Sequence, residues 1–301
     1  MNGVINVLKP PGMTSSDVVV YLRAKLGVRK VGHTGTLDPE AAGVLPICLG
    51  KATRISDYLM HQDKVYRCGM KLGIQTDTSD LTGKVTARTD QFPEEKQIME
   101  SMMSYLGESD QVPPMHSAIK MGGKKLYQLA RQGVTLEVPP RRIRIQQIRL
   151  LSFHPPDSIQ FEVSCSKGTY IRALCRDIGN DLGCGAVMSF LIRTGTGPFF
   201  IQESSSLDEI LLAMKQGYLF RLIQPMEKVL DPILPAIFLK EESYEKIRHG
   251  NSVGVEFLQR AMDGIVPGRP CRIFCGKTFM GIGYCKSSGN NEFIGMKSVL
   301  L

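Results

Sequence analysis

From the start of the chain, apolar residues occur in short continuous runs or at the spacing of one face of a helix. Residues 4–8 are mostly apolar, which predicts a strand, and the two prolines and one glycine of residues 9–12 predict a turn after it. Residues 14–17 (Thr-Ser-Ser-Asp) are typical of a helix start, and the apolar positions of residues 18–26 have helical spacing. Gly27 is suited to end that helix.

The same patterns predict further strands and helices in the following part of the chain. Strand patterns occupy residues 44–49, 65–72 and 161–165. Helical patterns occupy residues 52–59, 94–106 and 170–182. Predicted strands and helices therefore alternate along this part of the chain.

The pattern changes after residue 231. Pro232 and Pro235 stand between apolar runs and predict a domain junction. A short helix at residues 243–249 and several short strands separated by glycines follow; the strands are residues 271–274, 279–284 and 293–296. Such a segment predicts a small β-barrel-like module.

The net positive charge of the chain favours polyanionic partners but does not distinguish among them. The 301 residues carry a formal net charge of +8, which favours nucleic acid, a membrane surface or phosphorylated ligands. Eight of the cations lie in residues 120–149, where Glu137 is the one acidic residue. We therefore interpret residues 113–140, with the arginines that follow, as a basic insertion.

Cysteine and histidine spacing argues against metals. The eight cysteines are scattered without a Cys-x-x-Cys pair, and the five histidines are never at ligand spacing, so we expect no metal. Residues 77–83 resemble a calcium loop but lack its ligand pattern, and we interpret them as an exposed turn. We expect no membrane partner and a reducing cytoplasmic location, since a signal region and a long apolar span are missing from the sequence.

Residues 32–39 (Gly-His-Thr-Gly-Thr-Leu-Asp-Pro) are predicted to form a loop, because two glycines and a proline argue against any regular element. A residue before proline adopts extended conformations, so Asp38 presents its carboxylate from a stiff backbone. Such a carboxylate is a candidate nucleophile or base. A turn-forming Asp-Pro pair is the alternative.

This loop resembles the nucleophile loop of the TruB pseudouridine synthases, which make pseudouridine at position 55 in the T loop of tRNA. Similar segments follow one another in order between residues 4 and 195; they include residues 9–15, 42–46, 64–67, 73–78, 113–120, 123–127 and 166–172. The last part of the chain is similar, more loosely, to a PUA RNA-binding module. The resemblance implies an α/β (α+β) pseudouridine synthase fold with a mixed, largely antiparallel sheet and flanking helices. It also implies an isomerisation that needs no cofactor, because substrate and product are isomers.

The resemblance also implies catalytic roles. Asp38 matches the family's nucleophile, and Arg172 matches the arginine that pairs with it and orients its carboxylate. Tyr66 matches the tyrosine that stacks on the uracil, and its hydroxyl is a candidate base for the C5 proton. Core packing for Tyr66 and a surface position for Arg172 are the alternatives. Attack by Asp38 on C6 of the base or on C1′ of the sugar stays open.

Four further residues match substrate-binding positions. Tyr170 and Leu191 match residues that line the uracil pocket, and His33 matches the histidine that enters the T loop. Lys64 lies in the matched segment before Tyr66 and is a further candidate for binding the substrate. Plain core packing is the rival interpretation for Leu191.

The predicted organisation is a catalytic domain at residues 1–232, with a basic thumb-like insertion at about 113–140, and a PUA-like RNA-binding domain at 233–301. We expect a monomer that binds the tRNA T stem-loop and extrudes the target uridine. The rivals are a non-catalytic RNA-binding protein with this fold and a pseudouridine synthase that acts on another RNA. The first is disfavoured by the intact set of Asp38, Tyr66 and Arg172.

Overall fold

The computed structural model describes all residues except 118, 135, 260–264 and 289–290. The described helices are α1 (Ser15–Leu26), α2 (Ser56–Met60), α3 (Glu95–Ser104), α4 (Leu126–Arg131), α5 (Ile171–Asp181), α6 (Leu207–Lys215), α7 (Met226–Leu230) and α8 (Tyr244–Arg248). Short 3₁₀ helices are η1 (Gly50–Ile55), η2 (Ile201–Glu203), η3 (Leu219–Arg221), η4 (Glu241–Ser243) and η5 (Val255–Phe257).

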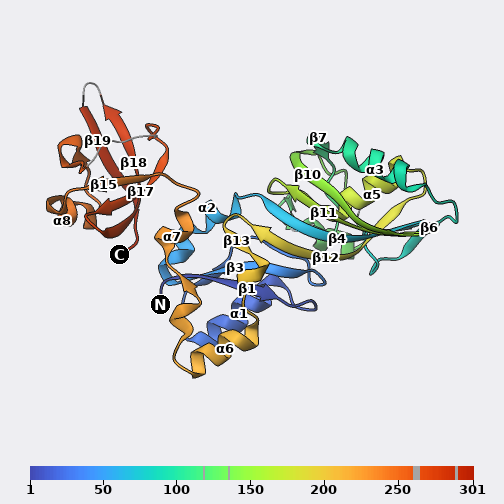
Figure 1. Cartoon of the computed structure of the whole chain (residues 1–301), viewed down its shortest axis with the longest axis horizontal. Coiled ribbons are helices and arrows are strands. Elements are labelled where there is room, and N and C mark those ends of the chain that lie inside the picture. The colour runs from blue at the N-terminus through green and yellow to red at the C-terminus, as the bar shows by residue number, and fades with distance from the viewer. Residues whose placement is uncertain (118, 135, 260–264, 289–290) are drawn as a thin grey trace.

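A ten-stranded sheet forms the body of the molecule (Figure 1). Its strands, in spatial order, are β14 (Ile223–Gln224), β1 (Gly3–Lys9), β3 (Ala42–Leu49), β12 (Ala186–Thr196), β4 (Lys64–Leu72), β11 (Ser158–Cys165), β10 (Arg141–His154) and β7 (Gly107–Gln111), with β2 (Val31–His33) beside β3 and β13 (Phe199–Phe200) beside β12. Only β12 and β3 pair in parallel among these described strands. The prediction of a mixed, largely antiparallel sheet is therefore confirmed.

Helices cover the two halves of this sheet separately. Helices α1 and α6 pack with β1 and β3 around one apolar core, and α3 and α5 pack with β4, β10, β11 and β12 around another (Figure 1). The first helix has the predicted ends, since Thr14 caps it through the Asp17 N–H and Gly27 adopts the left-handed conformation with φ of 62°. The strand β12 joins the two halves because it pairs with both β3 and β4.

Three local predictions need correction. Val31 to His33 form β2, so the loop begins at Thr34; pairing with β3 outweighs the local effect of Gly32. The helix expected at residues 52–59 is divided into η1 and α2. The arginines of residues 141–149 belong to β10, where they alternate with inward-facing isoleucines, and not to the insertion.

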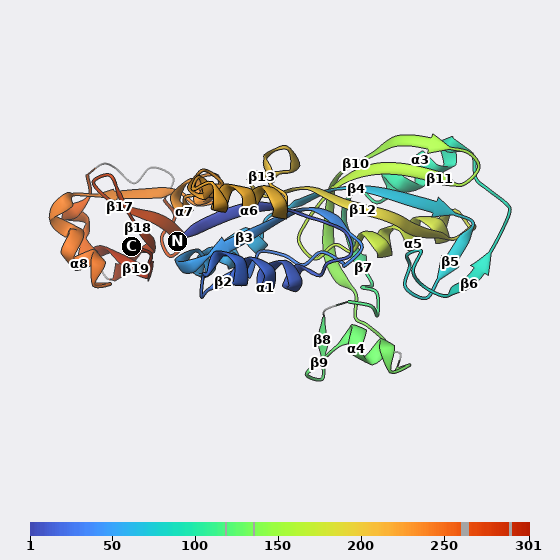
Figure 2. The same ribbon diagram turned by 90° about the horizontal axis from the view of Figure 1, so that it is seen from below.

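The insertion itself projects from the body, as Figure 2 shows for α4 and the hairpin of β8 (Lys120–Met121) and β9 (Lys124–Lys125). A second small hairpin pairs β5 (Ile74–Thr76) with β6 (Val85–Arg88). It lies between β4 and α3 in the sequence, and Asp80 lies in the loop that joins its two strands.

A five-stranded sheet lies at one end of the molecule (Figure 1). Its order is β15 (Ala236–Leu239), β17 (Pro270–Cys275), β18 (Thr278–Ser288), β19 (Asn291–Val299) and β16 (Val253–Gly254). Ile282 and Leu300 pack into the same buried cluster as Val4 and Val44, and Arg54 donates a hydrogen bond to the Val299 carbonyl (3.0 Å). The small sheet is thus joined to the body through a shared apolar core, to which η1, α2 and α7 also contribute residues.

Candidate active site

The loop of residues 34–41 is held by residues 9–15, which connect β1 to α1. Lys9 Nζ donates to the Pro39 carbonyl (3.0 Å) and to the Pro10 carbonyl (2.7 Å), and the Gly12 N–H donates to the Pro39 carbonyl (2.9 Å). The Ser15 hydroxyl accepts from the Leu37 N–H (2.9 Å). Residues 9–15, from the end of β1 to the start of α1, therefore fix the backbone on both sides of Asp38.

Lys9 is unusual because its side chain is fully buried. Burial lowers the pKa of its ammonium to about 8, and the nearby carboxylates of Glu40 and Asp38 act in the opposite direction. The Lys9 ammonium binds the carbonyls of Pro10 and Pro39 together, so its structural role is to hold the loop against β1.

Arg172 brings Asp38 to the centre of the site. Its Nε lies 2.9 Å from Oδ2 of Asp38 and its Nη2 donates to Oδ1 at 3.3 Å, which is a two-point pair between guanidinium and carboxylate. The Arg172 side chain is 6% exposed, whereas that of Asp38 is 40% exposed. The carboxylate is therefore fixed in direction by a buried cation and is still open to a substrate.

Three more acceptors surround the same guanidinium. Nη2 donates to the His116 carbonyl (2.7 Å), Nη1 donates to the Thr78 carbonyl (3.2 Å), and Oδ2 of Asp80 lies 3.7 Å from Nη1. The interpretation of residues 77–83 as an exposed turn is wrong for Asp80, whose side chain is 20% exposed. Sequence reasoning missed this residue, although the matched segment 73–78 ends two positions before it.

The start of α5 positions Arg172. Tyr170 is the N-cap residue, and the side chain of Gln111 from β7 bonds its backbone twice, accepting from the Tyr170 N–H (2.8 Å) and donating to its carbonyl (3.1 Å). Burial raises the pKa of the Tyr170 hydroxyl, and the charge of Asp38 acts in the same direction. The residue that begins α5 is thus fixed two positions before Arg172.

An apolar wall lies beside the carboxylate. Leu37 of the loop, Tyr66 of β4 and Leu191 of β12 belong to one cluster of buried residues, and Leu191 is the cross-strand neighbour of Cys68. Burial raises the pKa of Tyr66, so its hydroxyl is neutral in the resting site. Tyr66 and Leu191, which are predicted to contact the uracil, thus belong to the same buried cluster as the residue that precedes Asp38.

His33 and Lys64 have partners of their own. The His33 Nδ1 accepts from the Gly35 N–H (3.3 Å), and burial, assisted by the charge of Arg193, lowers the pKa of its imidazole. Lys64 is buried and donates to the Met60 carbonyl (2.7 Å) and to the Gln62 carbonyl. Burial lowers the pKa of Lys64 to about 8. Its role in substrate binding stays a prediction.

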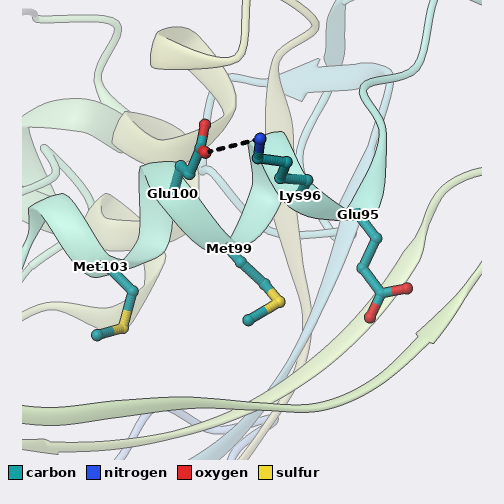
Figure 3. Close-up of a pocket in the computed structure, with 5 residues that line it drawn as sticks. All are labelled: Glu95, Lys96, Met99, Glu100 and Met103. Atoms are coloured by element: carbon teal, nitrogen blue, oxygen red, sulfur yellow. Dashed lines mark ion pairs between the residues drawn. The ribbon is translucent and has the colours of Figure 1, made fainter.

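Other features of the surface are separate from this site. A hollow along the outer side of α3 is formed by Met99, Met103 and the ion-paired Lys96 and Glu100 (3.9 Å), and it includes none of the predicted site residues (Figure 3). In the described part of the chain, no cluster of three or more histidine, cysteine or acidic side chains is placed to bind a metal. None of the described helices is long and apolar enough to cross a membrane.

Solved structures establish the fold. The chain superimposes on the "Crystal Structure of a Cbf5-Nop10-Gar1 Complex" with a TM-score of 0.78 and 30% identity, covering 99% of this chain and 85% of that one. It superimposes on the "Structure of H/ACA RNP bound to a substrate RNA containing 2'-deoxyuridine" with a TM-score of 0.77 and 28% identity, over 99% and 85% of the two chains. The fold is therefore shared with these two chains.

Sequence families define the class. Residues 23–171 match the model for the N-terminal domain of the TruB family pseudouridylate synthases, and residues 172–231 match the model for the C-terminal domain of tRNA pseudouridylate synthase B. Fold, site and these matches together define a pseudouridylate synthase, which is an isomerase. Because β12 lies within the second match, the ten-stranded sheet contains strands from both matched segments.

Curated relatives identify the particular family. The chain is 42% identical to tRNA pseudouridine synthase B of Alkaliphilus oremlandii over 293 residues, which are 97% of this chain and 96% of that protein. It is 40% identical to tRNA pseudouridine synthase B of Clostridioides difficile over 302 residues, covering 99% and 98%. The chain belongs to the TruB family.

Proposed function

We propose that this enzyme isomerises uridine to pseudouridine at position 55 in the T loop of tRNA, with Asp38 as the nucleophile. The observation that carries the proposal is the two-point pair between Asp38 and the buried Arg172. The names of the relatives, tRNA pseudouridine synthase B, support tRNA as the substrate. The resemblance of residues 32–39 to the family's nucleophile loop supports the position and the role of Asp38.

The chemistry needs no redox partner because substrate and product are isomers. The N1–C1′ bond breaks, the uracil turns, and a C5–C1′ bond forms, while one proton leaves C5 and one is gained at N1. The Asp38 carboxylate attacks C6 of the base or C1′ of the sugar, and both routes need a fixed, accessible oxygen. Arg172 supplies the direction through two hydrogen bonds, and the exposed part of Asp38 leaves room for the base.

The base must leave the folded RNA loop to reach Asp38, so contacts to the RNA have to offset its unstacking. We assign these contacts to His33 at the end of β2, to Tyr66, Tyr170 and Leu191 around the base, and to Lys64. The insertion supports this assignment, since Lys120, Lys124 and Lys125 lie on the hairpin that projects from the body (Figure 2). Phosphates are attracted by such a cluster.

Residues 233–301 are proposed to form a PUA-like RNA-binding domain and residues 1–232 the catalytic domain. The second sheet supports this boundary because it begins with β15 at Ala236. We propose that the enzyme acts as a monomer, without a metal, in the cytoplasm.

The test is release of tritium from C5-labelled uridine in a T stem-loop, compared with an RNA that has cytidine at position 55. The variant Asp38→Asn preserves shape and removes the nucleophile, so turnover should be lost while RNA binding is kept. Glu40→Gln is the matched control because Glu40 is an exposed carboxylate of the same loop, and it should be active. Turnover by Asp38→Asn near the wild-type rate, or equal turnover of both RNAs, would contradict the proposal.

A further inference from the structure

Arg193 is a buried cation that the roles above leave unused. Its residue is 1% exposed, and in β12 it lies opposite Tyr66 of β4 and Gly43 of β3. Nε donates to the Val44 carbonyl (2.7 Å) and Nη2 donates to the Gly35 carbonyl (3.1 Å). Within the described residues no carboxylate forms an ion pair with it, in contrast to Arg172. Burying an arginine without a carboxylate is costly, so a compensating use is expected.

The electrostatic influence of Arg193 reaches the catalytic side chains. It lowers the pKa values of His33, Lys9 and Lys64, although burial is the larger cause for each. Tyr66 lies opposite Arg193 across the pair of β4 and β12, and the positive charge of Arg193 opposes the burial that raises the tyrosine pKa. Asp38 and Cys165 also influence the Tyr66 hydroxyl and act in the opposite direction to Arg193. Arg193 is thus the cation that favours a negative charge on the Tyr66 oxygen.

We infer that Arg193 is a positioning residue that holds the Tyr66 hydroxyl and stabilises its phenolate, so that Tyr66 can move the C5 proton of the rejoined base to N1. The inference rests on the proposed function, because it concerns the last step of that isomerisation. A neutral tyrosine is a poor base. It becomes a good one after it has given its own proton away next to a fixed positive charge.

Tyr66 can carry out both proton transfers of this step by itself. After the C5–C1′ bond has formed, C5 bears both the sugar and a proton, and N1 has no proton and is joined to C6 by a double bond. The Tyr66 hydroxyl gives its proton to N1, and the oxygen becomes a phenolate next to Arg193. That phenolate then takes the proton from C5, the C5–H electron pair forms the C5–C6 double bond, and the Tyr66 hydroxyl is restored. N1 and C5 both flank C6, so one oxygen can serve both atoms.

The experiment compares Arg193→Gln, Arg193→Lys and the control Arg67→Gln in single-turnover reactions with C5-protonated and C5-deuterated T stem-loops. Arg67 is the next residue after Tyr66, but its side chain is 56% exposed and pairs with Glu162 (3.1 Å), so its variant should match the wild type. Arg193→Gln should lower the single-turnover rate about 10²-fold and raise the C5 deuterium isotope effect above the wild-type value, with RNA binding unchanged. Arg193→Lys keeps the charge and should recover most of the rate.

The isotope effect separates the inference from a purely structural role. A slower Arg193→Gln enzyme with an unchanged isotope effect would overturn the inference, since proton transfer from C5 would not have become limiting. If Arg193→Gln does not fold by circular dichroism, Arg193→Lys decides: a wild-type isotope effect with most of the rate supports the inference, and a rate as low as that of Tyr66→Phe overturns it. A wild-type enzyme that makes no pseudouridine in this RNA would refute the proposed function instead.

Discussion

Replacing Asp80 by asparagine tests the contacts that hold Arg172. The amide keeps the shape of the side chain, and its oxygen can still accept from Thr82 N–H (3.0 Å) and from the Thr78 hydroxyl (2.7 Å). What is lost is a negative charge 3.7 Å from Nη1 of a buried guanidinium. We therefore expect Arg172 to hold Asp38 less firmly, without loss of the fold.

The structure bounds the size of the effect. Unit charges about 4 Å apart interact by about 4 kcal/mol at an effective dielectric constant of 20, which would correspond to nearly a thousandfold in rate. The His116 carbonyl, the Thr78 carbonyl and Asp38 still hold the guanidinium in the variant, so the activation free energy should rise by less than this interaction energy. We expect kcat to fall by about 10- to 100-fold and the KM for a T stem-loop to change little.

The assay is tritium release at saturating and limiting RNA, with melting curves for each protein. Asp77→Asn is the matched control because Asp77 is an exposed aspartate of the same loop that accepts from the Lys84 N–H (2.8 Å). If Asp80→Asn and Asp77→Asn both turn over at the wild-type rate, the contact of Asp80 with Arg172 has no part in catalysis. A drop that follows a lower melting temperature would likewise count against the reasoning.

Three further predictions follow from burial and packing. Tyr66→Phe should bind the T stem-loop almost normally and lose about 10²-fold or more of kcat, whereas Tyr66→Leu should also bind less well, because stacking on a base is worth about 1–3 kcal/mol; near wild-type turnover by the phenylalanine variant would show that Tyr66 only stacks. Truncation after residue 232 removes Ile282 and Leu300 from the core shared by the two sheets, so the shortened protein should melt at a lower temperature as well as show a raised KM; an unchanged melting temperature would contradict the shared core. Burial lowers the pKa of Lys64 to about 8, so between about pH 8 and 10.5 the unfolded chain binds more protons than the native one. In urea titrations the wild type should therefore gain stability relative to Lys64→Met as the pH rises through that window. A stability difference that does not change with pH would argue against a buried ammonium.

Local signals in the sequence were sufficient for the elements with distinctive ends. The helix α1 could be predicted with its cap at Thr14 and its stop at Gly27, because capping and left-handed glycine depend on a few neighbouring residues. The identity of the loop around Asp38 came from the resemblance of residues 32–39 to a family. Its pairing with Arg172 was expected on the same ground, and the structure places the two side chains in contact.

Tertiary structure decided which polar residues are buried around that loop. Arg172 and Asp38 are 134 positions apart, and Asp80 joins them only because the loop between β2 and β3, α5 and the segment after β5 converge. Lys9 and Arg193 resemble surface cations in sequence, since charge and spacing do not reveal that backbone carbonyls will enclose them. A side chain's partners across the sheet depend on strand order and register, which are set by packing of the whole core and not by any local run of residues.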